Sequence, residues 1–221
     1  MNINEKMFEF KNEDDAIAMS SYMRNKFKFL GIKSPKRKEI FKQIFENFKN
    51  NKEIDKEFVV KFFNKDYREF QYIAIDYLIK MKKYFLKDDI FFIKDLIITK
   101  SWWDTVDLIA SNLLGEICKK YPSLIDEQIV FWINDENMWL RRSSIIFQLR
   151  YKENTNLEIL QKSIESNIDD DEFFIQKAIG WALREYSKTD YKWVLNFINN
   201  HNLSKLSKRE AEKYIKRGEF S

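Results

Sequence analysis

Cysteine and histidine are almost absent from this chain of 221 residues, which holds one of each, Cys118 and His201. Disulfide frameworks, zinc clusters, Cys/His nucleophile pairs and Ser-His-Asp triads all depend on these residue types. We therefore expect no disulfide, no metal site and no cofactor. Any chemistry must then rely on carboxylates, aromatic rings and cations.

Turn-forming residues are also scarce, because the chain contains only four glycines and two prolines. Gly and Pro together make up about 12% of an average protein, and a β-sandwich or barrel needs many tight turns. Apolar residues instead recur at helical spacing, as at Ile75, Leu78 and Ile79, with polar residues between them. Composition and periodicity together predict an all-α protein.

Long apolar runs are missing as well. No stretch approaches the roughly 18 apolar residues that a membrane span requires, and the first residues show no signal-peptide pattern. We expect a soluble cytoplasmic protein that has no membrane partner.

Positive charge is concentrated near the two ends of the chain. The net charge is only +4, yet residues 22–49 contain nine Lys and Arg against two Glu, and residues 205–217 contain six against two. A basic surface of this kind suits a polyanion such as DNA. Lys, Asn, Ile and Phe are all abundant, however, so an AT-biased coding sequence is an alternative origin of the lysines.

A weak internal repeat indicates the architecture. Small residues recur at Ala74, Ala110, Ser144 and Ala178, in steps of 36, 34 and 34 residues. A period near 35 accommodates two helices and two turns, which is the unit of a HEAT-like α-solenoid. We predict one domain over residues 1–221, built from stacked antiparallel helix pairs and curved, with one helix of each repeat lining a concave face. The expected breaks between helices are the short polar segments 31–35, 50–55, 87–89, 121–123, 134–137, 152–156 and 187–190.

The densest group of chemically useful residues is the string from Ser101 to Asp107, SWWDTVD. If the string is helical with Ser101 as its N-cap, Trp103 and Asp107 stand one turn apart on the same face. Arg142 occupies a comparable place one repeat later, and Trp181 lies in the repeat after that. Two aromatic rings, a carboxylate and a guanidinium would then converge on the concave face.

A purely structural interpretation of the same residues is also open. Tryptophan most often packs between layers of a helical array, and an Asp in the first turn of a helix favours the helix dipole. On this interpretation, Asp107 and Arg142 form only an ion pair between repeats.

Several longer motifs resemble one known family. These motifs are YMRNKFKFLGI at 22–32, REFQY at 68–72, SWWDTVD at 101–107, MWLRR at 138–142 and QKAIGWALRE at 176–185. They are similar to the bacterial DNA alkylation repair enzymes of the AlkD type, which are HEAT-like DNA glycosylases, and the resemblance extends over about residues 16–215. It implies a site formed by Trp103, Asp107, Arg142 and Trp181, with Tyr22 as a further residue near the N-terminus.

The resemblance also implies a reaction. The family removes N3- and N7-alkylated purines such as 3-methyladenine and 7-methylguanine from double-stranded DNA. In this chain Asp107 would stabilise the sugar as it becomes oxocarbenium-like, the two tryptophans would present their π-faces, and Arg142 would hold a phosphate. The residues expected to contact the rest of the duplex are Tyr22, Arg24, Lys26, Lys36, Arg37, Lys38, Arg141, Arg184, Lys208 and Arg209. We expect a monomer.

Two other functions fit the same scaffold. A non-enzymatic protein that binds DNA structures would use the basic residues and leave the tryptophans to pack. A solenoid that binds other proteins along its concave face is the third possibility, although it leaves the basic ends unexplained.

Overall fold

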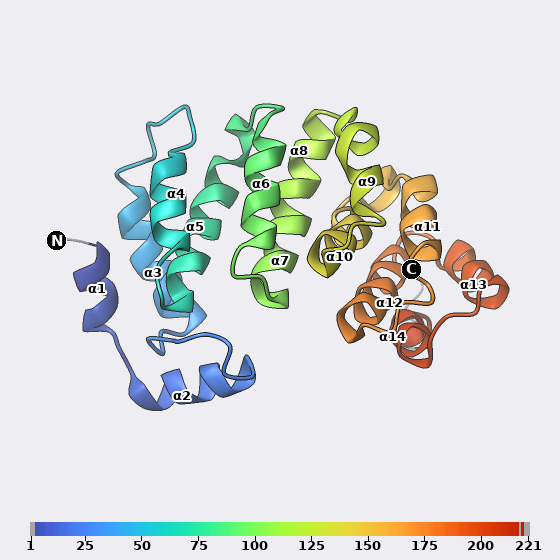
Figure 1. The fold of residues 1–221 in the computed structure, drawn as a ribbon, viewed down its shortest axis with the longest axis horizontal. Helices are drawn as coiled ribbons and strands as arrows, with labels where there is room; N and C mark the ends of the chain where they lie inside the picture. Colours follow the sequence, from blue (N-terminus) through green and yellow to red (C-terminus); the bar gives the residue numbers. More distant parts are fainter. Residues whose placement is uncertain (1–2, 217, 219–221) are drawn as a thin grey trace. The chain divides into compact units, whose positions relative to one another are not determined.

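The computed structural model describes residues 3–216 and residue 218. Regular secondary structure in these residues is helical throughout, apart from one isolated β-bridge between Lys28 and Tyr67 (Figure 1). The all-α prediction is therefore confirmed. Within the described residues, no helix is both long enough and apolar enough to span a bilayer.

The chain divides into two compact units, Met1–Phe85 and Leu86–Ser221. The single domain expected from the sequence stays a prediction. The N-terminal unit contains α1 (Ile3–Glu9), α2 (Glu13–Tyr22), α3 (Ser34–Phe45), α4 (Lys56–Phe63), α5 (Arg68–Met81) and a 3-10 turn (Lys82–Tyr84). The C-terminal unit contains α6 (Asp89–Ile98), α7 (Trp103–Ile109), the π-helical segment η2 (Ala110–Leu114), α8 (Gly115–Lys120), a second π-helical segment (Ile125–Ile129), α9 (Val130–Trp132), α10 (Met138–Ile146), a 3-10 turn (Lys152–Asn154), α11 (Leu157–Glu165), α12 (Phe173–Tyr186), α13 (Tyr191–Asn200) and α14 (Lys205–Ile215).

The N-terminal unit is built around α5, which is buried on nearly all sides. A helix with this burial pattern serves as the centre of a core. α4 packs against it through Phe58, Phe62 and Phe63, and Asp55 caps α4 by accepting a hydrogen bond from the Phe58 amide at 2.8 Å. The cap satisfies one amide that the first turn of the helix leaves without a partner.

The basic loop, which we define as residues 23–33, is fixed to α5 by one buried side chain. The Glu69 carboxylate accepts hydrogen bonds from the backbone amides of Leu30, Gly31 and Ile32 at 3.0, 2.9 and 3.1 Å. Gly31 has φ +84, and a Cβ atom here would lie 2.0 Å from the Asn12 carbonyl oxygen. The loop therefore requires glycine at this position both for its conformation and for the close approach of α2.

The C-terminal unit has a core in which α10, α12, α13 and α14 contribute aliphatic side chains such as Ile145, Ile179 and Val194. α12 and α14 approach each other closely at Gly180, because a Cβ atom there would lie 2.5 Å from Cβ of Glu210. The Ser207 hydroxyl adds a hydrogen bond to the Gln176 carbonyl at 2.9 Å. Close backbone packing at a glycine thus holds the last helix in place.

The small residues of the predicted repeat lie in helical segments. Ala74 lies in α5, Ser144 in α10 and Ala178 in α12, while Ala110 begins η2 directly after α7, and all of them are buried. Because small side chains allow neighbouring helices to approach, the repeat marks the packed face of one helix in each pair. The helical-repeat architecture is confirmed, although the π-helical segments were not predicted.

Candidate active site

The doubled tryptophan separates into one core residue and one partly exposed residue. Trp102 is the N-cap of α7, with φ −160 and ψ 160, so the helix begins at Trp103. The expected N-cap at Ser101 was wrong, because its hydroxyl instead donates to the Ile97 carbonyl at 2.6 Å. Ser101 therefore accounts for one carbonyl at the end of α6, and the N-cap of α7 is Trp102, whose backbone is extended.

An aromatic cluster joins the starts of α7, α10 and α12. The Trp102 ring lies 5.8 Å from that of Trp139 and 4.9 Å from that of Phe174, and the latter two rings lie 5.2 Å apart. Tilted and edge-to-face contacts at these separations each stabilise a fold by about 0.5–1.5 kcal/mol beyond burial alone. The cluster fixes the backbone at Phe174, whose carbonyl accepts a hydrogen bond from Arg142.

Arg142 on α10 and Asp107 on α7 form a two-pronged ion pair. The Arg142 Nε donates to Asp107 Oδ1 and a terminal nitrogen donates to Oδ2, both at 2.8 Å. The side chains are 5% and 15% exposed, respectively. The convergence expected from positions one repeat apart is thus present, in the form that the structural interpretation also anticipates.

Two opposing effects act on the Asp107 carboxyl. Burial raises the pKa of Asp107 above its ordinary value, and nearby Asp104 adds to that effect, whereas the Arg142 guanidinium opposes both. A carboxylate offers about four lone-pair positions, so one hydrogen bond to each oxygen leaves acceptor capacity on both. The pair therefore orients the carboxylate without using all of its acceptors.

Asp107 borders an open groove of about 540 Å³ in the C-terminal unit. The groove is lined by Asp107, Leu108, Ser111, Leu149, Arg150, Lys152, Trp181 and Glu185. Trp181 is partly buried and rests against the core of the unit. Of the predicted catalytic residues, Asp107 and Trp181 meet at the groove, whereas Trp103 and Arg142 are not among the described residues that line it.

The predicted site did not include the groove residues Ser111, Arg150 and Lys152. Arg150 and Lys152 are exposed and follow α10, and Lys152 has the uncommon φ of +52. Arg150 lies four residues beyond the end of α10 at Ile146. The available signal was the pair of cations at the start of the break predicted at 152–156.

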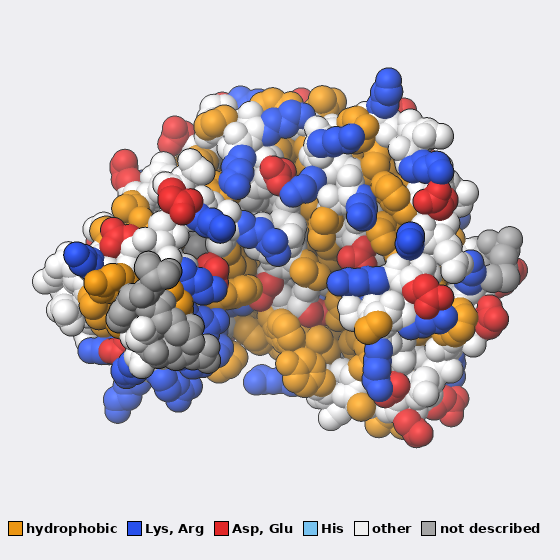
Figure 2. Space-filling model, turned by 180° about the vertical axis from the view of Figure 1, so that it is seen from behind, with side chains coloured by type: hydrophobic (Ala, Val, Ile, Leu, Met, Phe, Trp, Pro, Cys, Tyr) orange, Lys and Arg blue, Asp and Glu red, His pale blue; other side chains and the backbone are white. Residues whose placement is uncertain are grey.

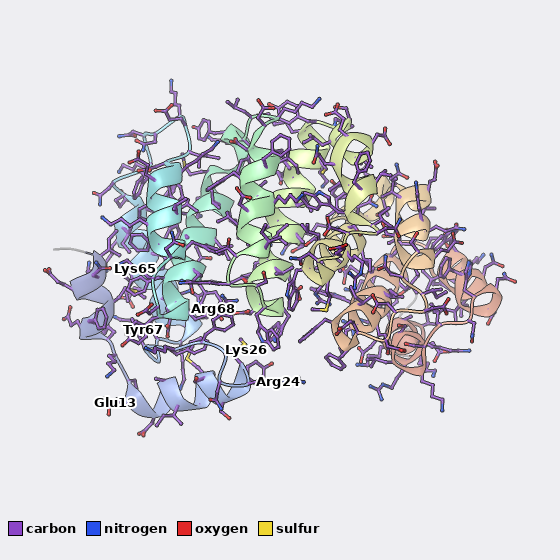
Figure 3. The ribbon with its side chains drawn as sticks, viewed as in Figure 1. Glu13, Arg24, Lys26, Lys65, Tyr67 and Arg68 are labelled. Atoms are coloured by element: carbon purple, nitrogen blue, oxygen red, sulfur yellow. The ribbon has the colours of Figure 1, made fainter. Side chains whose placement is uncertain are left out.

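Most of the residues predicted to contact DNA through the N-terminal unit are exposed. Tyr22 ends α2 and is 71% exposed, and Arg24 and Lys26 project from the loop that follows it (Figure 3). Lys38 is exposed, while Lys36 is partly buried and pairs with Glu39 at 3.1 Å. These side chains remain candidates for contact with a phosphate backbone.

Arg37 has a different environment, because its side chain is buried. Its Nε lies 3.5 Å from Asp76 Oδ2, and its guanidinium lies 4.5 Å from the centre of the Tyr72 ring. Asp76 itself has a pKa raised by burial, which the Arg37 charge opposes. Since these contacts occupy the guanidinium inside the N-terminal unit, we leave Arg37 out of the proposed DNA contacts.

The predicted cations of the C-terminal unit fall into two groups. Lys208 and Arg209 are exposed on α14. Arg141 donates to the Asp135 and Glu136 carbonyls and pairs with Asp170 at 3.0 Å, and Arg184 pairs with Glu210 at 3.2 Å. Figure 2 shows Lys and Arg side chains interspersed with acidic ones on one face of the molecule. Arg217, part of the predicted basic segment, lies outside the described residues.

Metal binding has no candidate site in the part of the chain that the structure describes. No group of three or more His, Cys, Asp or Glu side chains there is placed to hold an ion.

Two comparisons with known proteins agree on one family. The family profile for DNA alkylation repair enzymes matches residues 3–215. A solved structure described as a predicted DNA alkylation repair enzyme from Enterococcus faecalis is 34% identical, with a TM-score of 0.86, covering 93% of this chain and 96% of that one. The crystal structure of smu.31 from Streptococcus mutans UA159 shares the fold at 21% identity, with a TM-score of 0.59, covering 80% of this chain and 92% of that one.

A comparison with curated proteins gave no significant match. The family profile nevertheless spans nearly the whole chain, and the Enterococcus faecalis structure agrees with it along almost its full length. The chain belongs to the DNA alkylation repair enzyme family, and this membership supports a role in DNA repair.

Proposed function

We propose that the protein is a DNA glycosylase that excises positively charged N3- and N7-alkylated purines, including 3-methyladenine and 7-methylguanine, from duplex DNA. The observation that carries the proposal is that the Asp107 carboxylate and the Trp181 ring line the same open groove. An open groove that contains a carboxylate and an aromatic face suits a reaction in which a sugar becomes cationic.

The lesion supplies part of the activation. Alkylation at N3 or N7 gives the purine a formal positive charge, so the base leaves as a neutral molecule with the electron pair of the glycosidic bond. The protein must then stabilise a sugar with oxocarbenium character, which a partly desolvated carboxylate does electrostatically. Two observations support this role for Asp107: its side chain is mostly buried, and it borders the groove.

Arg142 acts in this proposal as a positioning residue for Asp107. Its guanidinium already donates to both Asp107 oxygens and to the Phe174 carbonyl. Those bonds fix the carboxylate plane and oppose the tendency of burial to protonate it. The contacts with phosphates next to the lesion are instead assigned to Arg150 and Lys152, which are exposed along the groove.

The aromatic residues complete the site. Trp181 offers a π-face to the cationic base or sugar, a contact worth about 0.5–2 kcal/mol depending on desolvation. Trp103 lies one turn before Asp107 on α7 and is partly exposed. We assign Trp103 to exclude water and support the damaged nucleotide from the same helix.

The test is base release from duplex DNA that contains 7-methylguanine, comparing the unaltered protein with Asp107→Asn. The substitution keeps the shape of the side chain and removes its charge, so excision should fall by about 10²-fold or more. Affinity for undamaged duplex should change little, because Asp107 makes no attractive contact with phosphates in this mechanism.

Asp95→Asn is the matched control, since it removes one carboxylate charge from an exposed position on α6. Excision by this variant should equal that of the unaltered protein. Near-normal release of 7-methylguanine by Asp107→Asn would contradict the role given to the carboxylate.

A non-enzymatic protein that binds DNA structures is the second candidate. It is favoured by the same ion pair, because both oxygens of Asp107 already accept hydrogen bonds from Arg142. Such a protein would retain alkylated DNA in a salt-dependent manner. It would release no free base at any protein concentration.

A further inference from the structure

We propose that Ser111 positions the attacking water together with Asp107. The inference rests on the proposed glycosylase function and extends it to the second reactant, the water molecule. Ser111 lies within η2, directly after α7, and its side chain lines the groove alongside Asp107 and Trp181.

The local backbone is unusual at this point. Residues Ala110–Leu114 form a π-helical turn, in which the Gly115 amide donates to the Ala110 carbonyl. Such turns insert one extra residue into an α-helix and often occur at functional sites. Here the turn begins three residues after Asp107, and its Ser111 lines the same groove as Asp107.

The hydrogen bonds of Ser111 leave its oxygen as an acceptor. Its hydroxyl hydrogen is donated to the Asp107 backbone carbonyl at 2.7 Å. One lone pair accepts a hydrogen from Asn112 Nδ2 at 3.2 Å. A hydroxyl oxygen has two lone pairs, so one remains for a donor in the groove.

A water molecule between Ser111 Oγ and the Asp107 carboxylate would donate one hydrogen to each. Its own lone pair would then point away from both acceptors, toward the sugar. As the C1′–N bond breaks, its electron pair goes to the base and cancels the positive charge of the alkylated ring. The water oxygen bonds to C1′, and the released proton passes to the Asp107 carboxylate and then to solvent.

The alternative is that the Ser111 hydroxyl only stabilises the π-helical turn. Ser143 on α10 provides a matched control, because its hydroxyl also donates to the carbonyl four residues earlier, at 2.7 Å. Ser143 is fully buried and is not among the described residues that line the groove. Loss of the same backbone hydrogen bond can thus be separated from loss of an acceptor in the groove.

The experiment measures single-turnover release of 7-methylguanine at saturating protein, together with DNA affinity and the midpoint of thermal unfolding. Ser111→Ala should be slower by about tenfold, which corresponds to one lost hydrogen bond to the reacting water. Its affinity for duplex DNA should stay within about twofold of the unaltered value. Ser111→Thr, which keeps a hydroxyl, should restore most of the rate, and Ser143→Ala should react at the normal rate.

The inference would be overturned if Ser111→Ala released base at a rate within twofold of normal, or if its rate loss disappeared at saturating protein. It would also be overturned if Ser111→Thr released base no faster than Ser111→Ala. If Ser111→Ala does not fold, Ser111→Cys gives the same comparison, because a thiol is a weak acceptor. Absence of base release by the unaltered protein would instead refute the glycosylase function itself.

Discussion

Glu210 provides a quantitative test of how the last helix is held. Its carboxylate is buried on α14 and forms ion pairs with Lys177 at 2.9 Å, Arg184 at 3.2 Å and Lys213 at 2.6 Å. Burial alone would raise the pKa of Glu210, but the hydrogen bonds from Lys213 and Lys177 outweigh it and lower the pKa to about 2 from 4.5. The folded protein therefore favours the ionised form.

The lowered pKa of Glu210 indicates how much its ionised side chain stabilises the folded protein. A pKa lowered from 4.5 to about 2 corresponds to about 3 kcal/mol, because each tenfold change in acidity is worth about 1.36 kcal/mol. The partner cations are 37%, 30% and 44% exposed, so solvent screens part of this energy. We expect Glu210→Gln to reduce the free energy of unfolding by about 2 kcal/mol at pH 7, and the thermal midpoint by roughly 5 °C.

The pH dependence follows from the sign of the shift. Because the folded pKa is depressed, the stabilisation is fully present above the unfolded pKa near 4.5 and is lost as pH falls toward 2. Urea unfolding at pH 7 and at pH 3 should show the difference between Glu210→Gln and the unaltered protein narrowing in acid. A difference that stays constant between these pH values would refute the electrostatic reasoning.

Glu212→Gln is the control on the same helix. Glu212 pairs with Lys216 one turn later, near the surface, and exposed pairs of this spacing contribute about 0.3–0.5 kcal/mol. An equal loss of stability in the two variants would show that helix α14 responds to any lost carboxylate.

Two further predictions concern helix packing and DNA contact. Gly180→Ala should destabilise the protein by about 1–3 kcal/mol in urea unfolding, although alanine has the better helix propensity. The new Cβ would lie 2.5 Å from Glu210 Cβ and 2.7 Å from the Ser207 carbonyl oxygen. A net gain in stability would contradict this packing. Arg150→Ala should weaken duplex binding and reduce the slope of log affinity against log salt by about 1. Lys192→Ala, which removes an exposed cation on α13, should leave that slope unchanged, and an identical slope for both variants would remove Arg150 from the interface.

Much of the helix layout could be predicted because the loops are short and polar. α12 ends at Tyr186 and α13 begins at Tyr191, on either side of the break expected at 187–190. The convergence of Asp107 with Arg142 also follows from their separation of 35 residues, which is one repeat. Periodic packing thus relates distant positions without an alignment.

Other features depend on tertiary contacts that no local pattern reveals. Ser101 resembles a helix cap, yet its hydroxyl bonds backward to Ile97 because the chain between α6 and α7 is so short. Arg37 has the sequence context of a surface cation. It is buried because it lies three and four residues before Ile40 and Phe41, on the buried face of α3. The groove residues Ser111 and Arg150 were missed because a π-helical turn and the residues after α10 shift them away from regular helical register.

Glu69 has a consequence for how the N-terminal unit is made. The amides of Leu30, Gly31 and Ile32 find their acceptor on a residue that is synthesised 37 to 39 positions later. While the chain emerges from the ribosome, the segment that carries Arg24 and Lys26 has its charges but not yet its conformation. A truncated product that stops before α5 would therefore lack the acceptor for these three amides, and the basic loop would not be held in this conformation.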